Sequence, residues 1–153
     1  MIVKITIIWC YFKKNQNKIY IFTLYYHSEM AAKAIAIIDD EIDLVNLFQE
    51  ALKNNGFKVC AFTDSIEAFN YIKRNLNDYG LILSNYRLPS MDGNELCIKL
   101  TSINPELKVI LMSAYDNIKC DSSKFTFIRK PIKISNLIKI VKDRLAETSY
   151  TTI

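Results

Sequence analysis

The body of this chain alternates between short apolar runs and amphipathic segments, and no other feature constrains its fold as strongly. Five runs are apolar almost throughout, which suits strands that are buried on both faces of a sheet. They span residues 34–38, 57–62, 80–84, 107–112 and 125–128. Parallel strands need crossover connections, and these connections are right-handed. The alternation therefore predicts an α/β fold, a doubly wound five-stranded parallel sheet.

Four amphipathic segments are expected to form the crossover helices: residues 41–56, 65–76, 94–103 and 135–145. The first has its apolar side chains on one helical stripe: Leu44, Val45, Phe48, Ala51 and Leu52. Gly56 follows the last turn of that helix, where a helix stop is expected. Asp64, followed three residues later by Glu67, is a capping pattern that predicts the start of the second helix.

Residues 1–30 differ in composition from the rest of the chain. Two apolar runs flank the polar stretch "KKNQNK", and each run is shorter than the roughly 18–20 residues that a membrane span needs. A small-residue cleavage site for a signal peptide is missing. A β-hairpin fits the Ile, Tyr, Phe and Thr content, but we favour Met30 as the real start. The expected division is an extension at 1–30, a globular domain at 31–146 and a tail at 147–153.

Charge and reactive side chains exclude several functions. The net charge is +4, of which residues 1–30 hold +3 and the remainder +1. The body thus lacks the basic stripe that nucleic-acid binding requires, and we expect no nucleic-acid partner. The four cysteines form no C-x-x-C pair, so reduced, buried thiols are favoured over a zinc site. With His27 as the single histidine, no Ser-His-Asp or Cys-His catalytic set exists.

Polar side chains stand at the carboxyl ends of the predicted strands. Asp39 and Asp40 follow the first strand, Asn85 the third, Ser113 the fourth and Lys130 the fifth. Each alone has a simpler explanation as a helix cap, a turn residue or a solvated charge. In a doubly wound sheet, however, these strand ends meet at one edge. Two adjacent carboxylates there need a cation, either the lysine or a divalent ion.

Four motifs occur in order on these strands: "IIDDE", "LILSNYRLPSMDG", "VILMSA" and "FIRKPI". With them, residues 33–146 resemble the receiver domain of response regulators in two-component phosphorelay signalling. The resemblance implies a flavodoxin-like receiver fold and a cytoplasmic signalling module that is not an enzyme. It also implies signalling proteins as partners, either a histidine kinase or a downstream effector, and no membrane partner.

The resemblance assigns the acidic end of the pocket to metal and phosphate chemistry. Asp39 and Asp40 correspond to the acidic pair that holds Mg²⁺, with help from the backbone carbonyl of Arg87. Asn85 stands where the phosphoacceptor aspartate is expected. Its amide oxygen carries no formal charge and is a poor nucleophile, so an acyl phosphate should not form there. Two carboxylates remain where three are usual, which predicts a weak Mg²⁺ site.

The resemblance also assigns residues on the last two strands. Ser113 and Lys130 correspond to the groups that contact the phosphoryl group, and the bond before Pro131 is expected to be cis. Phe127 occupies the aromatic switch position. The segment between Ser113 and Lys130 is several residues shorter than is usual in the family, which predicts a shortened fourth helix.

Asn85 suggests how the pocket is satisfied without phosphate. Its NH₂ group can donate to Asp39 or Asp40, and its oxygen can accept from Lys130. We therefore expect a receiver-like fold that is locked in one state and acts through protein–protein binding. Only a short polar tail follows Leu145, so we also expect it to stand alone, without an output domain.

The alternative is a working receiver that uses another acceptor, Ser84 or Asp92, or a deamidated Asn85. Neighbouring residues of a strand face opposite ways, so Ser84 should point away from a pocket that Asn85 faces. The bulky Tyr86 after Asn85 does not favour fast deamidation. An enzyme on the same architecture lacks the Gly-rich first turn that dinucleotide binding needs.

Overall fold

The computed structural model describes residues 3–7, 24–28, 33–115 and 125–146. The chain divides into two units, Met1–Ala32 and Lys33–Ile153. In the first unit, β1 (Val3–Ile7) and β2 (Leu24–Ser28) pair as antiparallel strands. This is the pairing that a hairpin requires, whereas the start of the native chain at Met30 stays a prediction.

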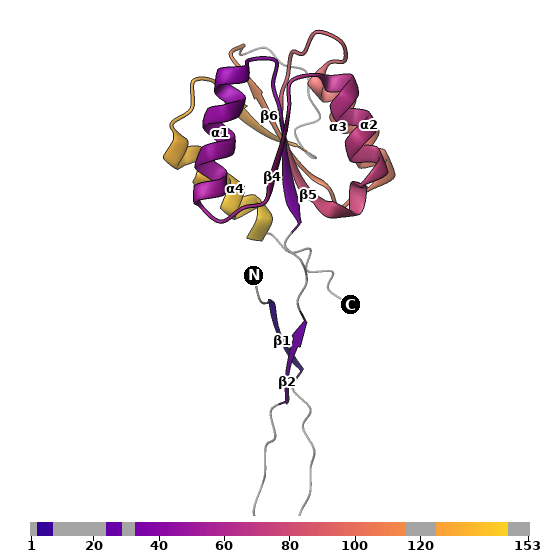
Figure 1. Cartoon of the computed structure of the whole chain (residues 1–153), viewed down its shortest axis with the longest axis vertical. Coiled ribbons are helices and arrows are strands. Elements are labelled where there is room, and N and C mark those ends of the chain that lie inside the picture. Colours follow the sequence, from indigo (N-terminus) through magenta and orange to yellow (C-terminus); the bar gives the residue numbers. More distant parts are fainter. Residues whose placement is uncertain (1–2, 8–23, 29–32, 116–124, 147–153) are drawn as a thin grey trace, which may run out of the picture. The chain divides into compact units, whose positions relative to one another are not determined.

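The second unit is built on a five-stranded sheet, with the order β4-β3-β5-β6-β7 (Figure 1). Its strands are β3 (Ala34–Ile38), β4 (Val59–Phe62), β5 (Tyr79–Asn85), β6 (Lys108–Ser113) and β7 (Thr126–Arg129). All four neighbouring pairs run parallel. The predicted doubly wound α/β fold is therefore confirmed.

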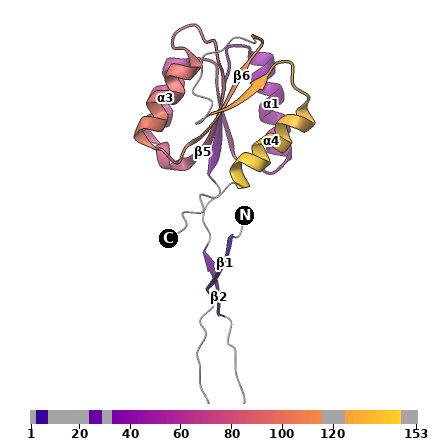
Figure 2. The same cartoon turned by 180° about the vertical axis from the view of Figure 1, so that it is seen from behind.

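Helices cover both faces of this sheet, as the two opposite views show (Figures 1 and 2). The helices α1 (Ile42–Asn54) and α4 (Ile134–Ala146) lie on one face. On the other face lie α2 (Ser65–Arg74), with a 3₁₀ turn over Leu76–Asp78 after it, and α3 (Gly93–Ile103). Residues 116–124, where a shortened fourth helix was expected, lie outside the described residues.

Side chains of β5 alternate between the two layers of the core. Leu81 and Leu83 pack in the cluster that also holds apolar residues of α1 and α4, whereas Ile82 packs in the cluster on the α2 and α3 side. By the same alternation, Ser84 belongs to the α2 and α3 side and Asn85 to the α1 and α4 side. The strand thus decides which of its last two residues can reach the pocket.

The helix ends show why one predicted boundary was wrong. Gly56 adopts φ +83°, and two hydrogen bonds close α1 beyond its last turn, from Gly56 N to Lys53 O (2.9 Å) and from Phe57 N to Leu52 O (3.2 Å). This is the Schellman arrangement, which draws Phe57 into the helix end. The strand expected from residue 57 therefore begins at Val59.

The capping prediction for the second helix is confirmed, because Asp64 Oδ1 accepts a hydrogen bond from Glu67 N at 2.7 Å. No helix within the described ranges combines the length and the apolar character that crossing a bilayer requires.

Candidate functional site

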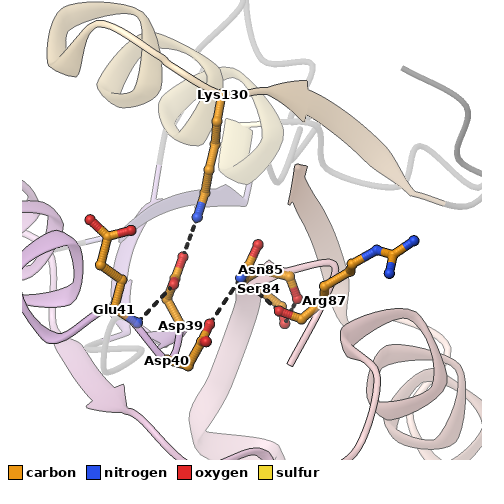
Figure 3. Close-up of polar contacts among 7 residues, drawn as sticks. All are labelled: Asp39, Asp40, Glu41, Ser84, Asn85, Arg87 and Lys130. Atoms are coloured by element: carbon orange, nitrogen blue, oxygen red, sulfur yellow. Dashed lines mark hydrogen bonds and ion pairs between the residues drawn. The ribbon is translucent and has the colours of Figure 1, made fainter. Parts of the chain in front are cut away.

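Polar residues from three of the strand ends, Asp39 and Asp40, Asn85, and Lys130, converge on one edge of the sheet (Figure 3). The backbone ties the neighbouring tips together, since Tyr86 N donates to Met112 O and Lys130 N donates to Ser113 O, each at 2.7 Å. Main-chain hydrogen bonds therefore hold the ends of these strands next to one another.

Asp39 and Lys130 form the deepest pair of the pocket. The Nζ atom of Lys130 lies 2.6 Å from Asp39 Oδ2, and the Asp39 side chain is only 1 % exposed. The other oxygen, Oδ1, accepts from Glu41 N at 3.1 Å. Because burying a carboxylate without partners is very costly, these two donors offset the cost of placing Asp39 inside the protein.

Asn85 uses its amide nitrogen to connect two other oxygens. Nδ2 donates to Asp40 Oδ1 at 3.1 Å and to the backbone oxygen of Arg87 at 2.7 Å. Figure 3 shows both contacts, with the guanidinium group of Arg87 directed away from Asp40. Of the two acidic partners expected for the amide, Asp39 and Asp40, the structure shows Asp40.

The second expected contact of Asn85 differs from the structure. No hydrogen bond among the described residues joins Lys130 to the Asn85 oxygen, because Lys130 binds Asp39 instead. A charged carboxylate is a stronger acceptor for an ammonium group than a neutral amide oxygen. The sequence placed both acceptors near Lys130, and the difference in charge decides between them.

Ser113, at the end of β6, is buried, and its Oγ atom accepts from Tyr115 N at 3.0 Å. The ring of Tyr115 lies beneath the guanidinium group of Arg87, at 5.0 Å from Cζ to the ring centre. Phe127 on β7 is half-buried and packs against the core cluster on the α2 and α3 side. The bond between Lys130 and Pro131 is cis, as expected. The signalling roles inferred for Ser113 and Phe127 stay predictions.

Sequence reasoning missed Gly93, where α3 approaches β5 most closely. A Cβ atom at this position would lie 1.9 Å from Asn85 O and 2.7 Å from Ser84 Oγ. Gly93 N also donates to Tyr86 O at 2.8 Å. A glycine is therefore needed here because of close backbone approach, and the Asp92-Gly93 step at the helix start was the signal available in the sequence.

Two titratable groups outside the pocket have altered acidity. Burial raises the pKa of the Cys97 thiol well above its usual value, and the nearby charge of Asp92 adds to the shift. Burial also raises the pKa of Tyr79, assisted by a hydrogen bond with Cys60. Cys97 is a buried free thiol, as expected, whereas the free thiol Cys60 is only partly buried; Cys10 and Cys120 lie outside the described residues.

The residues assigned to Mg²⁺ do not fit a cation in their present arrangement. A metal needs oxygens with lone pairs that face it, yet Asp40 Oδ1 and Arg87 O both face the amide hydrogens of Asn85. The remaining carboxylate, Asp39, faces Lys130 and Glu41 N. In the described part of the chain, no group of three or more His, Cys, Asp or Glu residues is placed to hold a metal ion.

Comparison with known proteins identifies the family of this chain. The sequence profile of the response regulator receiver domain matches residues 35–142. The chain is 30 % identical over 114 residues to the C4-dicarboxylate transport transcriptional regulatory protein DctD of Rhizobium meliloti. It is 25 % identical over 119 residues to the transcriptional regulatory protein ZraR of Klebsiella oxytoca. These matches cover 71 % and 74 % of this chain but only 24 % and 26 % of the two regulators.

Solved structures show the same fold. A CheY-like receiver domain protein from Methanospirillum hungatei superposes with a TM-score of 0.70 at 24 % identity, covering 75 % of this chain and 94 % of that one. The receiver domain of NtrX from Brucella abortus superposes with a TM-score of 0.66 at 27 % identity, covering 74 % and 99 %. The chain therefore corresponds to nearly all of a receiver domain and to about a quarter of the regulators that it resembles.

Proposed function

The chain belongs to the response regulator receiver domain family, and we propose that it is a member that signals by protein binding without accepting a phosphoryl group at residue 85. Receiver domains act in two-component signalling, where they interact with histidine kinases and effector domains, and they typically bind Mg²⁺ at the acidic site. The proposal includes no catalytic activity of the domain itself.

The orientation of the Asn85 amide carries this proposal. Phosphoryl transfer needs an anionic oxygen in line with the phosphorus atom, with positive charge nearby to neutralise the transition state. Residue 85 instead directs an N–H donor at Asp40 and at the Arg87 carbonyl. The amide nitrogen is no nucleophile, because its lone pair is delocalised into the carbonyl group.

The neighbouring hydroxyl and carboxylate are poor substitutes for the missing acceptor. Ser84 is fully buried, and its Oγ atom donates to Asn85 O at 3.0 Å on the side of the strand that faces α2 and α3. Asp92 caps α3, where its Oδ1 atom accepts from Asn94 N at 2.8 Å. Both side chains therefore have structural partners away from the pocket that Asp39 and Lys130 define.

Conversion of Asn85 to aspartate is also disfavoured by the backbone. Deamidation proceeds when the main-chain nitrogen of the next residue attacks the side-chain carbonyl carbon. Here that nitrogen, Tyr86 N, donates a 2.7 Å hydrogen bond to Met112 O on the neighbouring strand. The attack would require this hydrogen bond to break and the tip of β5 to leave the sheet, which supports a long-lived amide at position 85.

Phosphodonor labelling tests the proposal. The native chain and Asn85→Asp are incubated with acetyl phosphate and Mg²⁺, followed by intact mass measurement and peptide mapping. We expect no phosphoryl adduct on the native chain and a Mg²⁺-dependent adduct at residue 85 of the variant. Ser84→Ala and Asp92→Asn are the controls for the two alternative acceptors. Labelling of native residue 85 without deamidation, or labelling that either control abolishes, would refute the proposal.

Binding of a signalling partner supplies the second arm. A partner recovered with the native chain should bind it equally well with and without phosphodonor, because the native pocket does not respond to it. The same partner should bind Asn85→Asp in a way that changes when the variant is phosphorylated. A partner that binds the native chain only in the presence of phosphodonor contradicts the proposed mechanism.

A further inference from the structure

We infer that the Asn85 amide group takes the place of the divalent cation, so that the pocket is complete without metal and does not bind Mg²⁺. This inference deepens the proposed function and rests on the same pocket. It adds a different property, because loss of the phosphoacceptor alone would still leave a chain that could bind the metal.

The geometry of two hydrogen bonds carries the inference. The Nδ2 atom of Asn85 donates to Asp40 Oδ1 (3.1 Å) and Arg87 O (2.7 Å), and the family resemblance assigns the Asp40 carboxylate and the Arg87 carbonyl to the metal. A cation joins such oxygens by offering positive charge between them, at about 2.0–2.1 Å for Mg²⁺. The NH₂ group joins them through two partially positive hydrogens instead.

The amide in its present orientation and a cation therefore exclude each other. For Mg²⁺ to reach both oxygens, the Asn85 side chain would have to turn its NH₂ group away and break both hydrogen bonds. Turning the amide over would bring its own oxygen toward Asp40 and the Arg87 carbonyl, so that three acceptors would face one another without a donor. Only a tightly bound cation could stabilise that arrangement.

The charges of the pocket weaken the attraction for such a cation. Asp39 and Asp40 contribute two negative charges and Lys130 one positive charge, which leaves a net of −1. An aspartate at position 85 would make this −2. The lysine is already paired with Asp39 at 2.6 Å, so Asp40 is the one carboxylate of this set left for a metal, and the amide satisfies it. Mg²⁺ depends strongly on anionic oxygen ligands.

The test measures the response of folding to Mg²⁺. Thermal unfolding of the full chain is followed in chelator and in saturating Mg²⁺, for the native protein, for Asn85→Asp, and for Asn70→Asp on the exposed face of α2 as a control with equal charge change. We expect the native and control midpoints to stay constant within about 1 °C, and that of Asn85→Asp to rise by roughly 3–6 °C, because a ligand that binds only the folded state stabilises it.

Direct calorimetric titration of the native chain with Mg²⁺ keeps the test decisive if Asn85→Asp fails to fold in chelator. We expect no binding heat for the native chain at millimolar Mg²⁺. Saturable binding to the native chain, or a midpoint shift equal to that of Asn85→Asp, would overturn the inference. A native chain that binds Mg²⁺ but takes no phosphoryl group would defeat this inference alone, whereas labelling at native residue 85 would defeat the proposed function.

Discussion

Lys130→Met tests the deepest contact of the pocket and has a magnitude that follows from its burial. The substitution keeps most of the aliphatic side chain and removes the ammonium group that lies 2.6 Å from Asp39. Asp39 then retains one donor, Glu41 N, for a side chain that is 1 % exposed. Removing one partner of a buried ion pair costs about 3–5 kcal/mol, because the other charge is left buried and unpaired.

Urea unfolding of the full chain measures this cost. With a urea dependence of about 2 kcal/mol per molar, the expected loss lowers the unfolding midpoint by roughly 2 M. Lys139→Met, on an exposed position of α4, should change stability by less than about 0.5 kcal/mol. This control separates the loss of the ion pair from the general effect of exchanging a lysine for methionine.

The double variant Asp39→Asn/Lys130→Met completes the experiment. Removing the carboxylate charge as well should restore part of the stability lost in Lys130→Met, giving a coupling energy of about 2 kcal/mol or more between the two positions. Asp39→Asn alone should cost less than Lys130→Met, because the lysine is more exposed and its flexible chain can reach water. A loss below about 1 kcal/mol for Lys130→Met, or additive effects in the double variant, would refute the reasoning.

Three further predictions concern positions around and beyond the pocket. Gly93→Ala should cost on the order of 3 kcal/mol, or prevent folding, because its Cβ would lie 1.9 Å from Asn85 O; a urea midpoint close to that of the native chain would contradict this. Burial holds the pKa of Cys97 above the ordinary value of 9.0, so only the unfolded thiol ionises just above that pH. The free energy of unfolding should therefore fall by up to about 1.4 kcal/mol per pH unit above the ordinary thiol pKa. Cys97→Ala should remove this dependence on pH when unfolding is measured at successive pH values. Tyr115→Ala should remove the contact with the Arg87 guanidinium group, whereas Tyr115→Phe should keep it. In double-mutant cycles with Arg87→Gln, the coupling energy should therefore be about 0.5 kcal/mol for Tyr115→Ala and about zero for Tyr115→Phe.

The convergence of the strand tips was predictable because topology alone places it. Five apolar runs joined by amphipathic segments allow few arrangements, and parallel strands direct their carboxyl ends to one edge. Asp39, Asn85 and Lys130 could therefore be brought together without knowledge of any distance. The start of β4 was missed because the Schellman closure at Gly56 and Phe57 involves main-chain hydrogen bonds that apolar patterning does not reveal.

The pairing inside the pocket was less predictable. Asp39 and Asp40 are adjacent in the sequence, and only the structure shows that Lys130 reaches the first and Asn85 the second. The contact between Arg87 and Tyr115 joins two loops whose paths no periodicity describes. Side-chain partners of this kind depend on differences of about an ångström, which residue types and spacings do not encode.

The alternation along β5 has an evolutionary consequence. Because Ser84 and Asn85 face opposite layers of the core, the insertion or deletion of one residue in this strand would exchange those layers and bring Ser84 or Tyr86 to the place of Asn85. The direct way to gain a carboxylate at this place is therefore substitution at position 85 itself. Codons for asparagine and aspartate differ at a single base, so one point mutation would place a carboxylate at position 85 while every core residue stays in place.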